Sequence, residues 1–370
     1  MDKKNKSAKP AKEESRLGAV GGQAVLEGVM MKSKTDIAIA VRRESGEIVK
    51  SLKPSKSIKD KYKILNIPIV RGVVNFVEML SMSMSTMTES AEMLGLDEML
   101  AEESEKSNKK DTINSEISEI KDNSINKEDS IENSKDENKA NTPKMTLIAS
   151  IIGTVLGLAL AVGLFFFLPV FIGNQIKLAT GFQHRWFVSL IEGVTRLAIF
   201  LVYILLVSLL KDIRRTFEYH GAEHMSVFCY EAYDELTVEN ARKYSRFHPR
   251  CGTSFLIVMM IVGVVISMLI PVSIGMWFRL LIKIIIFPFV IGLGYEFIRY
   301  AGKHCSNIIV KIVSAPGLWI QRITTKKPDD RQLEVAIVSL RAALRIDPVE
   351  SAESVGNSIN AGLAEEISKN

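Results

Sequence analysis

Residues 145–173 read MTLIASIIGTVLGLALAVGLFFFLPVFIG and contain no charged side chain. A helix of about 20 apolar residues crosses the hydrocarbon core of a bilayer, so this stretch predicts a membrane span. Three further apolar runs follow, at 186–210, 253–272 and 277–298, the last interrupted by Lys283 and Pro288. We therefore expect a mainly α, polytopic membrane protein with about four transmembrane helices, in a membrane domain covering 145–298.

Positive charges predict the orientation of these spans. Seven lysines and arginines fall in 211–252, and seven more follow the fourth run between 299 and 331. The loop between the first two runs offers only Lys177 and Arg185. The positive-inside rule then places 211–252 and both termini in the cytoplasm of a multi-pass cell-membrane protein. The polar, lysine-rich start of the chain has no apolar segment behind it, so we expect no secretory signal peptide.

The polar parts of the chain divide into tails, a linker and two ordered blocks. Segments 1–16, 100–144 and 347–370 are too polar to bury a core, and we expect them to be disordered. An N-terminal α+β block is expected at 17–99, with a hairpin of strands at 36–41 and 47–52. Its second half, 64–94, reads as an interfacial helix whose methionines pack in a core.

A C-terminal cytoplasmic helical segment is expected at 299–346. Asp329 and Asp330 can cap a helix over 331–345. The apolar face of that helix comprises Leu333, Ala336, Ile337, Leu340 and Leu344. Such a face needs a partner, either the 211–252 loop or the N-terminal block.

Three of the five histidines lie in the loop expected between the second and third spans. His220 and His224 are four residues apart, so a helix places both on one face, where they can reach one ion. His248 and Cys251 follow, and imidazole and thiolate are the usual ligands of zinc-like metals. Glu223 completes an H-x-x-E-H order, in which the acid can serve as general base. The alternative is that these histidines are hydrogen-bonded or solvated helix residues.

A second motif surrounds one acid with glycines. Residues 21–31 read GGQAVLEGVMM, and Glu27 stands alone in this apolar run. A buried carboxylate needs a cation or a donor, so Glu27 is a candidate ligand or general acid/base. The alternative is a glycine-rich turn with an exposed acid.

Charged residues also fall within the apolar runs. Glu192 and Arg196, four residues apart near the start of the second run, can pair on one helix face. Buried charges in a bilayer are costly and often functional, but this pair can also snorkel to the surface. Arg279 and Lys283 lie near one end of the fourth run and are expected to snorkel outward. Glu296 and Arg299 at its other end are expected to face the headgroups.

The motifs together resemble those of the YqhQ-like family of bacterial membrane proteins, often labelled predicted metal-dependent enzymes. The resemblance rests on GQAVLEGVMM at 22–31, Arg71-Gly72, HGAEH at 220–224, HPRCGT at 248–253, and PDD at 328–330 followed by Gln332, Glu334, Val335 and Ala336. It covers roughly 17–95 and 145–345 and leaves out the charged insert. It implies a membrane protein with a histidine core, and it raises these residues as site candidates: Gln23, Glu27, Arg71, His220, Glu223, His224, His248, Arg250 and Cys251.

Three classes of function follow from these patterns. The first is a membrane-anchored hydrolase with a divalent metal, zinc by its ligands, at the cytoplasmic membrane surface. In the second, the same ligands form a closed structural site in a non-enzymatic assembly factor or scaffold. The third is a small transporter that uses Glu192 and Arg196. The expected partners are the lipid bilayer and other membrane proteins, and no nucleic acid is expected.

Overall fold

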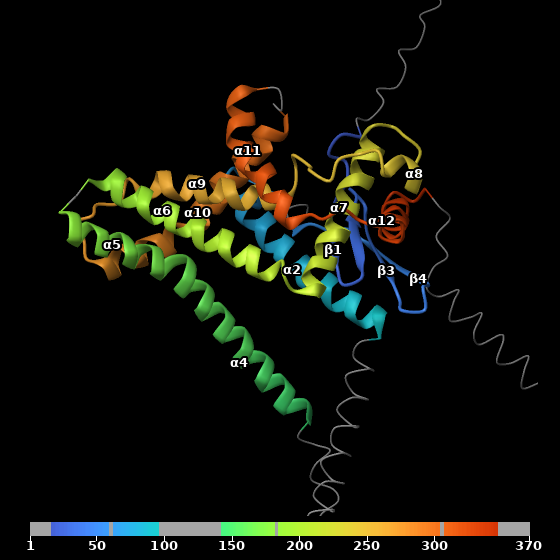
Figure 1. Ribbon diagram of the computed structural model, residues 1–370, viewed down its shortest axis with the longest axis horizontal. Coiled ribbons are helices and arrows are strands. Elements are labelled where there is room, and N and C mark those ends of the chain that lie inside the picture. Colours follow the sequence, from blue (N-terminus) through green and yellow to red (C-terminus); the bar gives the residue numbers. More distant parts are fainter. Residues whose placement is uncertain (1–15, 59–61, 96–141, 182–183, 304–306, 347–370) are drawn as a thin grey trace, which may run out of the picture. The chain divides into compact units, whose positions relative to one another are not determined.

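The computed structural model describes residues 16–58, 62–95, 142–181, 184–303 and 307–346 (Figure 1). The segments expected to be disordered, 1–16, 100–144 and 347–370, lie almost entirely outside these residues. The described chain divides into two compact units. The first takes residues from 1–94, 205–258 and 295–370, and the second takes residues from 95–204 and 259–294.

The first unit is built on a four-stranded antiparallel sheet in sequence order: β1 (Gly21–Val25), β2 (Gly28–Lys32), β3 (Asp36–Arg42) and β4 (Ile48–Pro54). The predicted hairpin is confirmed as β3 and β4, with Asp36 opposite Pro54. The glycine-rich motif is a second hairpin rather than an isolated turn. Leu26 and Glu27 connect β1 to β2, and Glu27 takes a left-handed φ of 48° at this tight connection.

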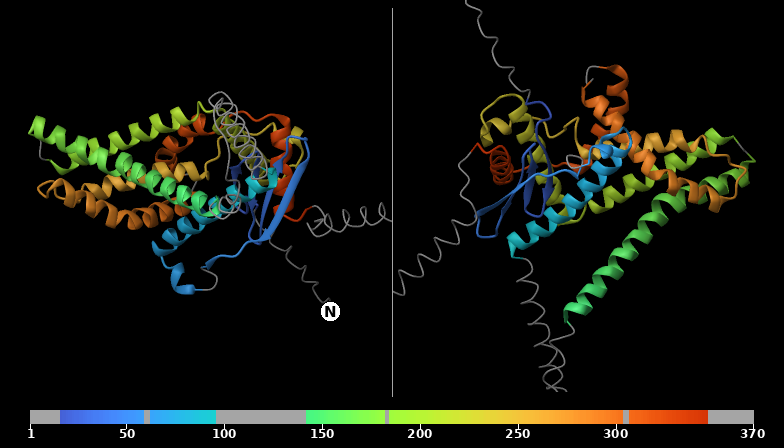
Figure 2. Two further views of the ribbon diagram at one scale, coloured as in Figure 1. Left: turned by 90° about the horizontal axis from the view of Figure 1, so that it is seen from below. Right: turned by 180° about the vertical axis from the view of Figure 1, so that it is seen from behind.

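Helices cover both faces of this sheet (Figures 1 and 2). α2 (Val70–Leu94) packs on one face, and α7 (Lys211–Glu231) and α12 (Asp330–Ala343) pack on the other. Because side chains alternate along a strand, Ile39 of β3 faces α2 while Ala38 faces the helix pair. The sheet is therefore buried on both sides, which explains why β2 reads as a continuous apolar run.

The predicted C-terminal helix is confirmed as α12. The Asp329 side chain accepts the Gln332 backbone N–H at 2.8 Å, and the Gln332 side chain accepts the Asp329 N–H at 2.9 Å. This reciprocal capping box satisfies donors that the first helical turn leaves free. Leu333 and Leu340 are fully buried against α7 and the sheet. The apolar face thus packs on both of its expected partners.

The N-terminal helix begins later than its apolar pattern predicts. A short 3₁₀ turn, η1 (Lys63–Asn66), precedes α2, which starts at Val70. Met82, Met87 and Met93 pack against the sheet, which confirms the expected core role for these three. Met84 is 72 % exposed and Met79 is 39 % exposed, so for these two the core prediction is wrong.

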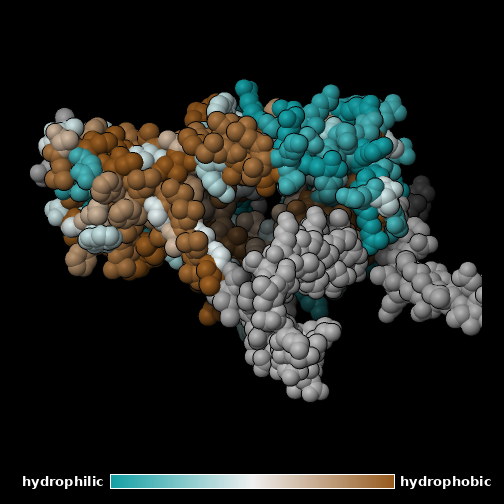
Figure 3. Space-filling model, turned by 60° about the horizontal axis from the view of Figure 1, so that its bottom comes forward, coloured by the Kyte–Doolittle hydropathy of each residue, from teal (hydrophilic) through white to brown (hydrophobic). Residues whose placement is uncertain are grey.

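The second unit is helical. Its elements are α4 (Thr142–Val162), the π-turn η2 (Gly163–Phe167), α5 (Leu168–Thr180), α6 (Arg185–Val207), and parts of α9 (Gly252–Ser267) and α10 (Met276–Lys303). Within the described residues, three segments are long and apolar enough to cross a membrane: Ile152–Thr180, Arg185–Val207 and Met276–Ala301. Hydrophobic side chains dominate the surface of these helices (Figure 3). The chain is thus mainly helical, with helices compatible with a membrane protein.

The predicted span at 253–272 is not confirmed. Its helix, α9, has 16 residues and ends at Ser267. At 1.5 Å per residue it is about 24 Å long, shorter than the hydrocarbon core of about 30 Å. The apolar run continues past Ser267 as turns, and hydropathy alone does not reveal where a helix ends.

The interspan segment 211–252 is mostly helix rather than loop. It contains α7 and the short α8 (Val238–Ala241). The expected C-terminal helical segment holds α11 (Ile308–Thr324) as well as α12. α7 and α12 complete the buried face of the N-terminal sheet, so the N-terminal block and these later segments form one compact unit.

Candidate metal centre

One face of α7 carries two histidines and two glutamates of the first unit. His220, Glu223, His224 and Glu231 recur at i, i+3, i+4 and i+11, which brings them onto one helical stripe. The glycine of HGAEH, Gly221, lies against the backbone carbonyl of Lys326, where a Cβ atom would overlap the oxygen. Lys326 N–H also donates to the Phe217 carbonyl at 2.8 Å. The glycine therefore allows the segment after α11 to cross α7 at backbone contact.

Backbone carbonyls from two different segments orient the two histidine rings. His220 Nδ1 lies 2.9 Å from the Thr324 carbonyl oxygen, and His224 Nδ1 lies 2.5 Å from the Arg246 carbonyl oxygen. A carbonyl only accepts, so each Nδ1 must carry the proton and donate it. In the neutral rings both Nε2 atoms then keep a free lone pair. Such a hydrogen bond is the usual support behind a metal-binding histidine.

Cys251 supplies a third donor atom. Its Sγ lies 3.3 Å from His220 Nε2, and the ligand atoms of His220, His224 and Cys251 all fall within 4.8 Å of one another. Around a tetrahedral zinc ion, ligand atoms at 2.0–2.3 Å from the metal are roughly 3.5 Å apart. Two neutral imidazoles and a thiol at these separations fit a zinc-like ion.

His248 does not join this group. Its Nδ1 accepts the Arg250 backbone N–H at 3.3 Å, and its Nε2 lies 3.5 Å from a carboxylate oxygen of Glu231. Both ring nitrogens are therefore directed to other partners, and the prediction of a His248 ligand is not supported by the geometry. Gln321 holds the His248 backbone from both sides, accepting its N–H at 2.7 Å and donating to its carbonyl at 2.8 Å.

Glu231 and Gln321 are the buried polar residues that sequence reasoning missed. Glu231 forms an ion pair with Arg250 and accepts the Gly18 backbone N–H at 2.8 Å. Burial opposes ionisation, but the bonds from His248, Gly18 and Arg250 outweigh it and hold the pKa of Glu231 below its usual value. Arg250 thus supports the site as a partner of Glu231. The sequence spacing could have identified Glu231, because it lies seven residues after His224 and continues the histidine stripe of α7.

Glu223 lies beside the ligand group. Its Oε2 is 3.4 Å from His224 Nε2, and the side chain is almost fully buried. Burial raises the pKa of this carboxyl, while nearby histidines and the Gly22 backbone N–H act in the opposite direction. A Cβ at Gly22 would come within 2.8 Å of Glu223 Cγ. Gly22, the second glycine of the GGQAVLEG motif, therefore allows β1 to approach this acid closely.

Three other predicted site residues tie elements together away from the histidines. Glu27 pairs with Arg215 and accepts the Tyr219 hydroxyl at 3.3 Å. Burial, with the Glu27 charge, raises the pKa of Tyr219. Gln23 donates to Thr86 of α2 at 2.6 Å, and Arg71 forms an ion pair with Glu296, so Glu296 has a protein partner as well as its expected place near the helix end.

The charged pair expected in the second unit is arranged differently. Glu192 forms ion pairs with Arg279 and Lys283, and Arg196 Nε donates to the Phe165 carbonyl at 2.8 Å. Arg279 and Lys283 are 2 % and 8 % exposed, so the expectation that they snorkel outward is wrong. The carboxylate of Glu192, buried among these helices, attracts both side chains inward.

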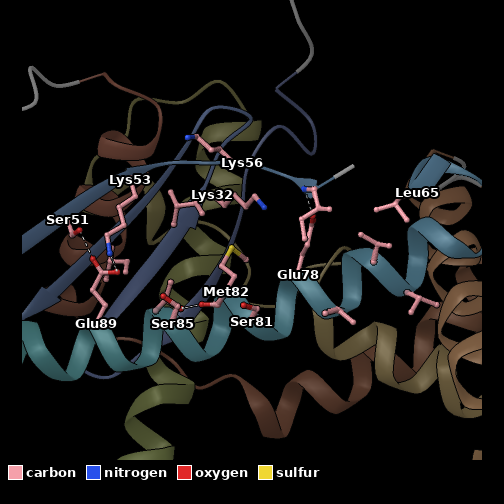
Figure 4. A pocket seen from close by; sticks show the side chains of 17 residues that line it. Lys32, Ser51, Lys53, Lys56, Leu65, Glu78, Ser81, Met82, Ser85 and Glu89 are labelled. Carbon is pink, nitrogen blue, oxygen red and sulfur yellow. Dashed lines mark hydrogen bonds and ion pairs between the residues drawn. The ribbon is translucent and has the colours of Figure 1, made fainter. Parts of the chain in front are cut away.

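A groove of about 610 Å³ lies between α2 and the β3–β4 face of the sheet (Figure 4). Apolar side chains such as Ile37 and Val77 line it, and a Lys53–Glu89 ion pair of 2.8 Å stands at its edge. None of the candidate metal ligands lines it. The groove faces α2, whereas α7 and its histidines pack on the other face of the sheet.

Comparison with known proteins agrees with the resemblance of the motifs. Residues 67–346 match the family described as "Protein of unknown function (DUF1385)". The chain is 32 % identical over 329 residues to "Uncharacterized protein YqhQ" of Bacillus subtilis (strain 168), covering 89 % of this chain and 93 % of that protein. No solved structure matches the chain. From the match over most of its length, the chain belongs to the DUF1385 family, and it is a relative of YqhQ.

Proposed function

We propose that this protein is an integral membrane protein that binds a zinc-like divalent ion through His220 Nε2, His224 Nε2 and Cys251 Sγ, and that the site is hydrolytic. The observation that carries the proposal is the pair of Nδ1–carbonyl bonds, which leave both Nε2 atoms without a proton in the neutral rings, with His220 Nε2 at 3.3 Å from the Cys251 thiol. The alternative is a hydrogen-bonded polar core without a metal, which predicts that the purified protein carries no stoichiometric zinc.

Three protein ligands are the pattern of catalytic rather than structural zinc sites, because a fourth position stays open. A metal ion held there would supply a bound water of lowered pKa. Glu223, next to His224 Nε2, is placed to accept a proton from a water at that position. The Gly22 N–H and the burial of the side chain keep this carboxylate in one orientation.

The proposal includes a location. The lysines and arginines of 211–252 and 299–331 support a cytoplasmic position for α7, at the inner surface of the cell membrane. The lipid bilayer is then the first partner of the chain, with α9 as a fourth, shorter membrane segment. On this topology both termini are cytoplasmic. Labelling of a cysteine placed at Thr237 from outside the cell would overturn it.

A closed structural site is the second candidate. The same 3.4 Å contact that favours Glu223 as a base would let its carboxylate act as the fourth ligand. The site would then join α7 to Cys251 at the start of α9 and stabilise a non-enzymatic scaffold. The role of Glu223 therefore separates the two candidates.

The experiment measures metal content and hydrolysis in the same preparations. The full chain is purified in detergent without chelators, and zinc per chain is determined by elemental mass spectrometry. His220→Ala and Cys251→Ala are expected to lose most of the metal. His184→Ala, which changes an exposed histidine outside the centre, should keep it.

Glu223→Gln keeps the size of the side chain and removes its charge and basic oxygen. If Glu223 is the base, this variant retains zinc but loses hydrolysis across a panel of phosphate-ester, carboxyl-ester and peptide substrates. If Glu223 is a ligand, bound zinc falls in parallel with that of His220→Ala. Wild-type protein without stoichiometric metal would contradict both candidates.

A further inference from the structure

The second unit buries a charge cluster made of side chains from two helices. Glu192 of α6 is 1 % exposed and forms ion pairs with Arg279 and Lys283 of α10. Gly173 of α5 closes the cluster from another side, since a Cβ there would come within 2.7 Å of Glu192 Cγ. These charges lie inside helices that are apolar enough to span a membrane.

The charges do not balance. Arg196 lies one turn after Glu192 on α6, and both Arg196 and Arg279 are within electrostatic range of Lys283. Arg196 bonds to the neutral Phe165 carbonyl, and its guanidinium lies 5.7 Å from the Phe166 ring centroid. Three cationic side chains therefore share one carboxylate. An excess of buried positive charge among apolar helices is costly and calls for an anion.

Two donors in the cluster also lack a partner. Among the described residues, Arg279 Nε and Ser189 Oγ are buried and form no hydrogen bond. Ser189 is 1 % exposed and lies three residues before Glu192, on the same face of α6. A buried donor without an acceptor costs about 1–3 kcal/mol, so native proteins seldom leave one unfilled. Excess positive charge and free donors occur together at this site.

The cluster lies near one end of the helices that form it. Glu192 lies seven residues after the start of α6, about 10 Å along the axis, and Arg279 lies three residues after the start of α10, about 5 Å. Lys177 Nζ, near the end of α5, donates to the Val272 carbonyl just before α10, so these helix ends meet. The cluster is thus about one to two turns from the ends of these helices.

We propose that Arg196, Arg279, Lys283 and Ser189 form a binding site for a phosphate-type oxyanion at the membrane interface, with Glu192 setting its affinity. Arginine forks and a hydroxyl are donors suited to phosphate oxygens. The group can come from an anionic phospholipid headgroup or from free inorganic phosphate. This site belongs to the second unit and does not depend on the metal centre.

The test uses the full chain in two arms. In the lipid arm, protein from nanodiscs containing phosphatidylglycerol is washed with detergent, and retained lipid is counted by native mass spectrometry. In the phosphate arm, delipidated protein in a neutral detergent is dialysed against radiolabelled inorganic phosphate. Binding in the first arm alone assigns the site to lipid, and saturable binding in the second assigns it to the free anion.

Arg279→Gln is expected to lower binding about tenfold, the effect of losing roughly 1.4 kcal/mol from one charged contact. The control, Arg185→Gln, removes the same charge from an exposed position at the start of α6 and should stay within about twofold of the wild type. Arg279→Lys, which keeps the charge, should fall between them and serves if the glutamine variant does not fold. If Arg279→Gln and Arg185→Gln bind lipid or phosphate equally well, the proposed site is wrong.

Glu192→Gln separates an anion site from a purely structural ion cluster. Removing the one carboxylate increases the excess positive charge, so the proposal expects severalfold tighter binding. If the cluster only joins helices, the same variant loses stability and gains no affinity. Wild-type protein that binds neither phosphatidylglycerol nor phosphate would also overturn the proposal.

Discussion

The two units of the chain bury polar groups in opposite ways. On α7, each ring N–H of His220 and His224 meets a backbone carbonyl, and the remaining lone pairs gather beside Cys251. Between α6 and α10, three cations surround Glu192, and Arg279 Nε has no acceptor. The first centre offers acceptor atoms, whereas the second carries excess positive charge and offers donors.

This difference is the reason that we propose a different ligand for each centre. Lone pairs without protons are completed by a cation, while N–H and O–H donors with excess positive charge are completed by an anion. The supporting elements differ as well. Backbone carbonyls orient the first centre and do not change with pH, whereas long charged side chains form the second. We expect the first to be the more rigid of the two.

We expect the largest effect from a substitution that disturbs the packing of α7 beside the histidines. Gly221→Ala would place a Cβ against the Lys326 carbonyl, and such overpacking typically costs about 1–3 kcal/mol. That cost opposes the roughly 1 kcal/mol that alanine gains over glycine inside a helix. We expect a lower melting temperature in detergent and reduced bound zinc.

Gly252→Ala is the matched control for this prediction. Gly252 follows Cys251 directly, but a Cβ there meets no atom within 4 Å. The variant should therefore melt and bind metal like the wild type. If Gly221→Ala behaves in the same way, close contact between α7 and the Lys326 segment does not orient the histidines.

A smaller effect is expected from removing the Ser189 hydroxyl, which tests whether it belongs to the proposed anion site. Ser189→Ala removes a buried hydroxyl that has no partner, so the protein should be unchanged or more stable by about 1 kcal/mol. Phosphate or lipid retention should nevertheless fall by a few fold. Ser208→Ala provides the comparison, because the Ser208 hydroxyl already donates to the Leu205 carbonyl at 2.7 Å. Unchanged retention in Ser189→Ala would remove this hydroxyl from the anion site.

The smallest effect concerns a balanced charge pair in the first unit. Arg345 donates to both carboxylate oxygens of Asp36, at 2.8 and 2.9 Å, and joins the end of α12 to β3. The hydrogen bonds from Arg345 and Thr35 lower the pKa of Asp36 below 3.8, its ordinary value. A lowered carboxyl pKa stabilises the fold above the unfolded-state value, and this contribution is lost as pH falls through the folded value.

Asp36→Asn should therefore cost about 1 kcal/mol or less at pH 5–8, and its difference from the wild type should close below about pH 4. Melting curves across pH measure this. Glu44→Gln, at an exposed turn position, should follow the wild type at every pH. A difference that persists unchanged at pH 3 would mean that Asp36 acts by packing rather than charge.

Patterns local in sequence predicted much of this architecture. Alternating residues predicted the β3–β4 hairpin, and Asp329 and Asp330 marked the start of α12, because both features depend on neighbouring residues. The histidine stripe on α7 followed from the helical repeat. The span predicted at 253–272 was not confirmed, because its helix ends at Ser267 and the apolar run continues as turns.

Residue composition and spacing by themselves determined the apolar helices, the capped α12 and the pairing of His220 with His224 on one helical face. Only the tertiary structure decided that Cys251 Sγ lies 3.3 Å from His220 while the nearby His248 ring faces Arg250 and Glu231, and that Glu192 meets Arg279, 87 residues away. The physical reason is that these contacts depend on where backbones cross closely. At Gly221 and Gly173 the absence of a side chain allows that approach, and no periodic pattern records which segment will fill the space.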